Sequence, residues 1–128
     1  MSSIKNNNIF EKTSFLGNNS SELIEKKVFI EYLKKELSLI NPSIIISFGE
    51  LSYTLLMNKS LEKEEFNQIR GQLFKFSEYP VVPTFNPSYL LLKDSLETKR
   101  YFWEDLLIVM NELKLEITEK QKKYFKKQ

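Results

Sequence analysis

Residues 44–49 restrict most strongly what this chain can fold into. Ile44-Ile45-Ile46-Ser47-Phe48 is a continuous, largely β-branched run that ends directly at Gly49. A short apolar run of this kind is typical of a strand covered on both faces in a parallel sheet. Helical patterns precede it at 19–40 and follow it at 50–58, and the glycine permits a sharp turn from strand to helix. The segment therefore predicts helices packed against a sheet.

The flanking elements are marked by start and stop signals. Asn19 is the predicted N-cap of the first helix, with Glu22 three residues later, and Asn41-Pro42 is the predicted stop. Two further strands are predicted, at 72–76 and at Val81-Val82, the second bounded by Pro80 and Pro83. Residues 84–92 are predicted to form a loop, and a turn is predicted at residues 77–78.

A long helix is predicted after this loop. Asp94 with Glu97 three residues later resembles a capping box, and apolar residues follow at helical spacing. The predicted core face of this helix consists of Leu96, Phe102, Trp103, Leu106, Val109, Met110 and Leu113. Asp105 on the same helix is interpreted as a carboxylate that anchors the preceding loop.

The order of elements predicts an α/β fold with three layers, α/β/α, around a mainly parallel sheet. Residues 20–116 form the predicted domain, between a polar segment at 1–19 and a lysine-rich tail at 117–128. Ligands of such sheets bind beyond the carboxyl ends of the strands. Function is therefore expected at Gly49-Glu50 and at residues 84–88, although Gly49 and Glu50 themselves are interpreted as structural.

Composition excludes several kinds of chemistry. The 128 residues contain no cysteine and no histidine, which excludes cysteine–histidine nucleophiles, disulfides and His or Cys metal sites, and no metal or other cofactor is expected. No apolar run approaches the ~20 residues that span a bilayer, and the polar start does not resemble a signal peptide, so a cytoplasmic location without membrane contact is expected. Net charge is +2, with +4 on residues 118–128, which are interpreted as a solvated and partly disordered terminus.

Four strings in a fixed order carry a resemblance to a known family. They are Pro42-Ser43-Ile44-Ile45-Ile46-Ser47-Phe48-Gly49, Ile69-Arg70-Gly71, Val81-Val82-Pro83-Thr84-Phe85-Asn86-Pro87-Ser88-Tyr89-Leu90-Leu91 and Trp103-Glu104-Asp105-Leu106. Together they resemble the carboxy-terminal half of the uracil-DNA glycosylase superfamily, in particular its iron–sulfur, thermophile-type branch, family four. The resemblance covers about residues 20–115.

The resemblance implies roles for the loop residues. Asn86 takes the position that holds the uracil O2 atom while negative charge develops during glycosidic cleavage. Pro87 and Ser88 shape the loop and reach the phosphate backbone, and the wedge that opens the DNA is supplied by Tyr89, Leu90 and Leu91. Arg70 is interpreted either as an ordinary turn residue or as an arginine that faces DNA or braces the sheet.

The chain also departs from the family pattern. The glycine-rich Gly-Glu-x-Pro-Gly type motif, which positions the attacking water, has no counterpart in the sequence. The cysteines of the iron–sulfur branch are absent, two of them from positions near Ser14 and Phe29, and Leu92 replaces the arginine that usually ends the loop. The fold implied is therefore an incomplete one, in which the sheet lacks the strand of the first motif.

These observations predict a degenerate DNA repair domain of the glycosylase type, weak or inactive alone. It would recognise a flipped uracil in uracil-containing or abasic DNA, with a possible protein partner supplying the missing half, as in a truncated gene product or a split enzyme. The alternative is a non-enzymatic replication or repair interaction module, similar to the psi subunit of the bacterial clamp loader, which has a glycosylase-like fold without the activity. A globular remnant without a ligand is a third possibility.

Overall fold

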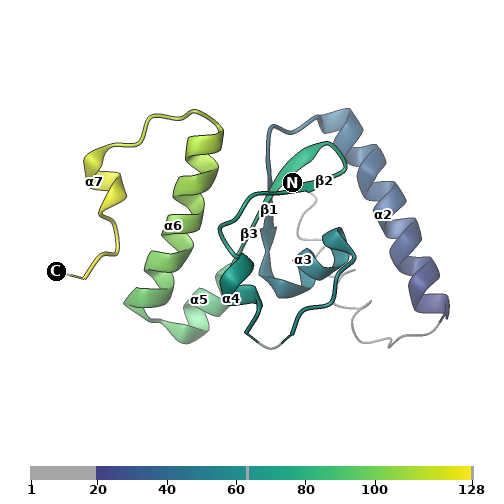
Figure 1. Ribbon diagram of the computed structural model, residues 1–128, viewed down its shortest axis with the longest axis horizontal. Coiled ribbons are helices and arrows are strands. Elements are labelled where there is room, and N and C mark those ends of the chain that lie inside the picture. Colours follow the sequence, from purple (N-terminus) through teal and green to yellow (C-terminus); the bar gives the residue numbers. More distant parts are fainter. Residues whose placement is uncertain (1–19, 63, 128) are drawn as a thin grey trace.

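The computed structural model describes residues 20–62 and 64–127 and shows three layers (Figure 1). The helices α2 (Ser20–Ile40) and α3 (Gly49–Met57) lie on one side of the sheet, and α6 (Leu96–Glu112) lies on the other. The remaining helices are short: α4 (Phe66–Ile69), α5 (Pro87–Lys93) and α7 (Glu119–Lys122). The predicted α/β layering is confirmed. The predictions for residues 1–19, including Asn19 as an N-cap and Ser14, lie outside the described residues.

The described sheet has three strands in the order β1-β3-β2. β1 (Ile45–Phe48) pairs with β3 (Tyr79–Thr84) in parallel, and β2 (Phe74–Phe76) pairs with β3 in an antiparallel hairpin that turns at residues 77–78. The strand predicted at residues 72–76 is therefore shorter than expected, and β3 extends through both prolines that were expected to bound it. Both Val81 and Val82 are fully buried, as the apolar pattern predicted.

The side of the sheet that faces α2 holds the main hydrophobic core. Its buried members are Leu37, Phe76, Tyr79 and Val81, and Leu56 of α3 packs against them. The Tyr79 hydroxyl donates to the carbonyl oxygen of Leu37 at 3.2 Å, which ties β3 to the end of α2. Helix α2 ends as predicted, because Asn41 adopts a left-handed φ of 50° immediately before Pro42.

The other side of the sheet faces α6 and is more polar than predicted. Asp105 and Val109 are buried on α6, whereas Leu96 and Leu113, expected in the core, are 48% and 37% exposed. The Phe48 ring stacks on Phe102 with centroids 6.4 Å apart. The apolar stripe predicted as core is thus only partly buried, because Asp105 occupies the centre of the face toward β3.

β1 was predicted to be covered on both faces, and this prediction is wrong for most of the strand. Ser47 is its one buried residue, at 2% exposure, while the isoleucines are half-buried. The reason is that β1 is an edge strand of the described sheet, since β3 is the only strand that pairs with it within the described residues. The Ser47 hydroxyl is buried there without a hydrogen-bond partner among those residues.

Three predictions around the long helix need correction. Residues 87–93, predicted as part of a loop, form helix α5, because Pro87 is favourable in a first turn and Asn86 caps it. The cap of α6 is Ser95, whose hydroxyl accepts from the Thr98 backbone N–H, and not Asp94, which ends α5 in a left-handed conformation. The C-terminal tail was predicted as a solvated terminus; its lysines are exposed, but it also forms helix α7 and packs on α6. Within the described part of the chain, no helix is long and apolar enough to cross a membrane.

Candidate functional site

Parallel pairing brings the two predicted functional segments together. Phe48 at the end of β1 is in register with Thr84 at the end of β3, so Gly49 and Asn86 follow at the same edge of the sheet. Gly49 has a φ of +88°, and a Cβ at this position would lie 3.5 Å from the Asn86 Cβ and 3.8 Å from its Nδ2. The glycine therefore lets the turn into α3 pass close to the Asn86 amide.

Asn86 is held by its role as a helix cap. Its Oδ1 accepts a hydrogen bond from the Ser88 backbone N–H at 3.0 Å, which satisfies one of the free donors at the start of α5. The oxygen of the amide is thus engaged, and the Nδ2 group has no acceptor within the part of the chain that the structure describes. The half-buried side chain presents two N–H donors in a fixed orientation.

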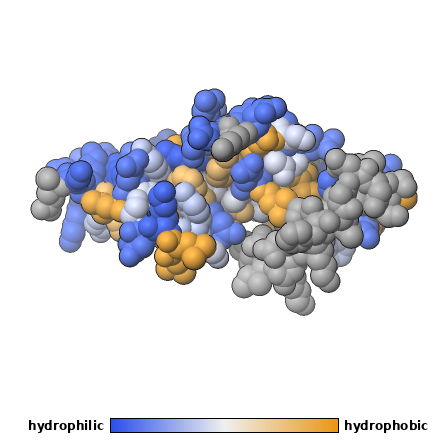
Figure 2. Space-filling model, turned by 90° about the horizontal axis from the view of Figure 1, so that it is seen from below, coloured by the Kyte–Doolittle hydropathy of each residue, from blue (hydrophilic) through white to orange (hydrophobic). Residues whose placement is uncertain are grey.

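Helix α5 presents apolar side chains to the outside beyond Asn86. Leu91 and Leu92 are 83% and 87% exposed, whereas Leu90 is half-buried. Figure 2, which views the molecule from the end at which α5 lies, shows hydrophobic groups projecting from a largely hydrophilic surface. The Tyr89 ring stacks on Phe85 with centroids 5.4 Å apart, so it is fixed against the strand end. Pro87 and Ser88 are exposed at the start of the helix.

A buried polar network fixes the strand end that carries this site. The Thr84 hydroxyl donates to Asp105 Oδ2 at 2.6 Å, and Arg70 Nη1 donates to Asp105 Oδ1, also at 2.6 Å. Thr84 is fully buried and Asp105 is 1% exposed. The interpretation of Asp105 as a carboxylate that reaches back to the motif segment is therefore confirmed, because Thr84 stands two residues before Asn86.

Arg70 lies in this network, close to aromatic side chains. Its guanidinium is 4.4 Å from the centroid of the Tyr101 ring and 5.6 Å from that of Phe85, and its side chain is only 16% exposed. The geometry is that of an arginine that braces the sheet against α6, one of the two roles considered for it; its contact with DNA stays a prediction. The sequence did not predict Phe85 and Tyr101 as partners of Arg70, or Thr84 as a partner of Asp105. The spacing could have indicated Tyr101, which stands one helical turn before Asp105 on the same face of α6.

Burial dominates the electrostatics of Asp105. Removal from water raises the pKa of this carboxyl to about 6, although the hydrogen bond from Thr84 and the charge of Arg70 both act to lower it. The charged form is therefore penalised near neutral pH despite a favourable partner. The site is thus held by a carboxyl group whose pKa lies about two units above its ordinary value.

This shift predicts a pH dependence of stability. The folded-state pKa of about 6 lies above the ordinary value of 3.8, so the folded chain binds more protons than the unfolded chain between these values. The free energy of unfolding should then rise by about 1 to 3 kcal/mol as pH falls from 7 to 5. No histidine complicates this window. Denaturant titrations at several pH values check it, and Asp105→Asn should give a flat profile; an equal slope in that variant would contradict the assignment.

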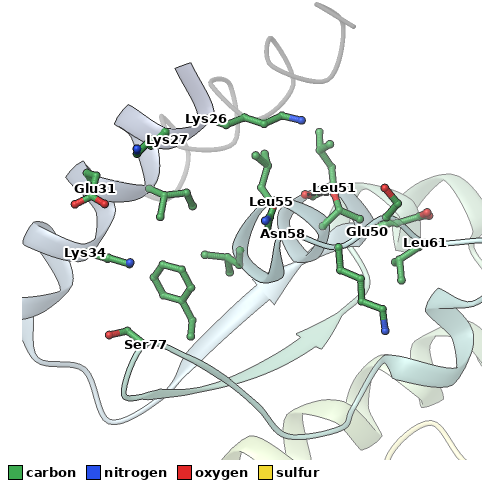
Figure 3. A pocket seen from close by; sticks show the side chains of 16 residues that line it. Lys26, Lys27, Glu31, Lys34, Glu50, Leu51, Leu55, Asn58, Leu61 and Ser77 are labelled. Carbon is green, nitrogen blue, oxygen red and sulfur yellow. Dashed lines mark hydrogen bonds between the residues drawn. The ribbon is translucent and has the colours of Figure 1, made fainter. Parts of the chain in front are cut away.

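A wide groove lies elsewhere on the molecule, between α2 and α3. It encloses about 850 Å³, and Figure 3 shows Lys27, Glu31 and Lys34 of α2 opposite Leu51 and Leu55 of α3. Glu50 also lines it, in the first turn of α3, where a carboxylate complements the helix dipole. None of Asn86, Pro87 and Ser88 lines this groove. The Asn86 site thus lies apart from this groove.

Comparison with known proteins decides the family. The sequence model of the uracil DNA glycosylase superfamily matches residues 9–107, a range that includes Gly49, Arg70 and Asn86. The chain belongs to the uracil-DNA glycosylase superfamily. It is also similar to the type-4 uracil-DNA glycosylase of Thermotoga maritima, with 30% identity over 76 residues, which are 59% of this chain and 38% of that relative. The superfamily member described here therefore spans well under half the length of the relative that it matches.

The iron–sulfur cluster implied by the resemblance does not fit this superfamily member. The sequence has no cysteine, and the cluster is normally held by cysteine thiolates. Phe29, which stands near one cysteine position of the iron–sulfur branch, is 7% exposed and packs with Leu55 in a hydrophobic cluster. An apolar core contact thus stands near the position of a cluster ligand.

Proposed function

We propose that this chain is a uracil-DNA glycosylase-like domain that recognises a flipped uracil in DNA and is weak or inactive as an enzyme alone. The observation that carries the proposal is the Asn86 amide. Its oxygen is engaged by the Ser88 N–H at 3.0 Å, so the N–H donors are left at the carboxyl edge of β1 and β3, beside Gly49. Donors held in this way favour an acceptor such as the O2 atom of uracil.

The chemistry would be stabilisation of the departing base as an anion. During excision the glycosidic bond breaks with water as the nucleophile, and negative charge develops on the uracil ring. A preorganised amide N–H stabilises this charge without having to reorient. The sequence lacks the glycine-rich motif that positions the water in the family, which supports weak or absent turnover by this chain alone.

The surroundings of Asn86 suit a DNA ligand. Pro87 and Ser88 are exposed at the start of α5, where the Ser88 hydroxyl would donate to a phosphate oxygen. Tyr89 and Leu91, at 43% and 83% exposure, together with the half-buried Leu90, would form the wedge between bases. Arg70 acts mainly by bracing β3 against α6 through Asp105, which keeps the Asn86 segment in place.

A second candidate function is a protein interaction module, and α2 favours it. The face of α2 opposite its buried residues carries an apolar stripe, in which each side chain is more than 60% exposed: Ile24, Val28, Tyr32 and Leu39. Exposed apolar groups aligned along one helix face are typical of a contact surface. A partner that supplies the missing half of the family fold would be one occupant of such a stripe.

Asn86→Asp tests the proposed function. The carboxylate keeps the oxygen that caps α5 and adds favourable charge at the helix start, so folding should be preserved. It replaces the N–H donors with acceptors, so the preference for uracil-containing over undamaged duplex should fall about 10-fold or more. Fluorescence anisotropy measures both affinities. Asn86→Ser, which also caps a helix, should lose the preference without a change of charge.

The matched control is Asn111→Asp, the same substitution at an exposed position of α6. It should bind both duplexes like the unsubstituted chain. Equal preference for uracil in Asn86→Asp would overturn the role of this amide. An absence of any preference in the unsubstituted chain, with binding to a protein that Tyr32→Glu abolishes, would establish the interaction module instead.

A further inference from the structure

The C-terminal tail, residues 117–127, contains the short helix α7 and packs against the outer face of α6. Helix α7 begins with a full capping box, in which Thr118 and Gln121 each bond to the backbone of the other. The Trp103 Nε1 group donates to the Gln121 carbonyl oxygen at 2.6 Å. This segment lies beyond residues 9–107, which the superfamily model covers. The tail thus lies outside the matched range and has its own anchoring contacts.

Arg100 and Trp103 form the anchor. Arg100 Nη1 donates to the carbonyl oxygens of Lys122 and Tyr124, both at 2.8 Å. The Tyr124 and Phe125 rings lie 5.3 and 6.4 Å from the Trp103 ring, measured between centroids. These bonds engage backbone and aromatic groups of the tail and leave its lysine side chains outside the contact. The anchor therefore holds the tail without neutralising its charge.

The tail concentrates the positive charge of the chain. Residues 118–128 hold five lysines and one acid, a net charge of +4, while the rest of the chain carries −2. Lys122 pairs with Glu119 at 2.9 Å. Four exposed lysines make no ion pair within the described part of the chain: Lys120, Lys123, Lys126 and Lys127. Exposed lysines that have no acidic partner are suited to contact phosphate groups.

The contacts of Arg100 and Trp103 also fix the position of the charged tail relative to α6. Arg100 is in the second turn of α6, about 8 Å along the axis from the Ser95 cap. Lys99 beside it bonds to Asp94, the residue that ends α5. In Figure 1 the tail runs along α6 back toward the end at which α5 lies. Residues 122–124 of the tail are therefore held at the second turn of α6, the half of this helix that is nearer to α5.

We infer that the C-terminal tail is a phosphate-binding arm that contacts the DNA backbone beside the nucleotides bound at α5. The inference rests on the proposed function, because it takes DNA as the ligand of this end. Four lysines held on a fixed element bind phosphates by charge and release counterions, and they carry no sequence information. The arm adds affinity for any duplex and leaves the choice of base to the Asn86 site.

The test compares full-length chains in which four lysines are changed to glutamine. The arm variant carries Lys120→Gln, Lys123→Gln, Lys126→Gln and Lys127→Gln. The control carries Lys34→Gln, Lys35→Gln, Lys59→Gln and Lys75→Gln, which removes the same charge from other exposed positions. Anisotropy is measured on an undamaged duplex, and on the same duplex with one uracil, over a series of salt concentrations.

The expected result is a change in salt dependence in one variant only. The logarithm of the association constant falls linearly with the logarithm of the salt concentration. In the arm variant the magnitude of this slope should be smaller by about 0.9 for each lost phosphate contact, up to about 3.6, equally for both duplexes. The control should keep the slope of the unsubstituted chain. Equal losses in both variants would show that net charge acts without an arm, and would overturn the inference.

Two further outcomes separate the arm from the site. If the arm variant shows the reduced slope but the unsubstituted chain shows no preference for uracil, the proposed function is refuted and the arm is supported. An arm variant that binds both duplexes like the unsubstituted chain, but no longer binds vesicles containing phosphatidylserine, would assign the lysines to a membrane surface and overturn the inference. Trp103→Leu keeps every lysine and removes part of the anchor, so it should weaken binding at a fixed salt concentration while the protein remains folded.

Discussion

Asp105→Ala should reduce the free energy of unfolding by about 3 to 5 kcal/mol, because it leaves a buried guanidinium without its partner. Arg70 is bonded to Asp105 at 2.6 Å and its side chain is only 16% exposed, so water cannot replace the carboxylate. The Thr84 hydroxyl, fully buried, loses its acceptor at the same time. Denaturant unfolding followed by the fluorescence of Trp103, the single tryptophan, measures the loss.

Asp105→Asn is the matched variant, because it keeps the shape and removes the charge. The amide oxygen can accept from Arg70 while its N–H group donates to the Thr84 hydroxyl, so no buried group is left unbonded. Burial already raises the pKa of this carboxyl to about 6, so a neutral amide avoids the desolvation cost that the carboxylate carries. A loss well below that of Asp105→Ala is expected. Equal losses would show that the negative charge itself stabilises the fold.

Gly71→Ala should also cost about 3 to 5 kcal/mol, through backbone strain and a clash together. Gly71 has a φ of +75°, and a Cβ there would lie 2.3 Å from Asp105 Oδ1. The carboxylate cannot move aside, because Arg70 and Thr84 hold it from both sides. The Gly71 N–H also donates to the Pro83 carbonyl oxygen at 2.8 Å, so a shift of this turn would reach β3. Thermal and denaturant unfolding measure the loss.

Gly49→Ala provides the control for this prediction. Gly49 has a similar φ of +88°, but the nearest atom to an added Cβ is 3.5 Å away, which is ordinary contact. Only the backbone strain remains, so a loss of about 1 to 2 kcal/mol is expected. If the two glycine variants were equally stable, the clash with Asp105 would not contribute. The comparison therefore isolates the effect of the network from that of the backbone.

The losses of stability predicted for Asp105→Ala and Gly71→Ala also affect the candidate site, because the buried network fixes the end of β3. Thr84 is the last residue of β3, and Asn86 follows after Phe85 at the start of α5. Arg70 and Asp105 fix Thr84 from the turn before β2 and from α6, and Arg70 also lies over the Phe85 ring. A variant that loosens the network should thus weaken uracil recognition as well as stability, even though no network residue faces the base.

Local signals in the sequence were sufficient for the main elements. The β-branched run before Gly49 predicted β1 and its parallel pairing, although the burial expected on both faces is found only at Ser47. Asn41-Pro42 predicted the end of α2, since proline cannot continue a helix and asparagine tolerates a left-handed conformation. The superfamily could also be predicted, from four strings in a fixed order, and residues 9–107 match its model.

Helix α5 and the packing of the C-terminal tail could not be predicted from the local sequence. The segment after Asn86 was predicted as a loop because Asn-Pro and Pro-Ser are common turn pairs, yet the same residues form the capped start of α5. The tail was predicted as a solvated terminus because lysines dominate it, yet Arg100 and Trp103 bind its carbonyl oxygens. In both cases composition was outweighed by a few specific hydrogen bonds.

The sequence by itself determined the layered α/β class and the absence of thiol and imidazole chemistry, and it predicted Asn86 as the central residue of the candidate site. These follow from periodicity, from residue types that are present or missing, and from spacing along the chain. Only the tertiary structure decided that Thr84, Asp105 and Arg70 form one buried network and that the tail lies along α6. The physical reason is the distance along the chain. The hydrogen-bonded residues of the network are 21 or more positions apart, and those that join α6 to the tail are 18 or more positions apart, so no local pattern encodes their pairing.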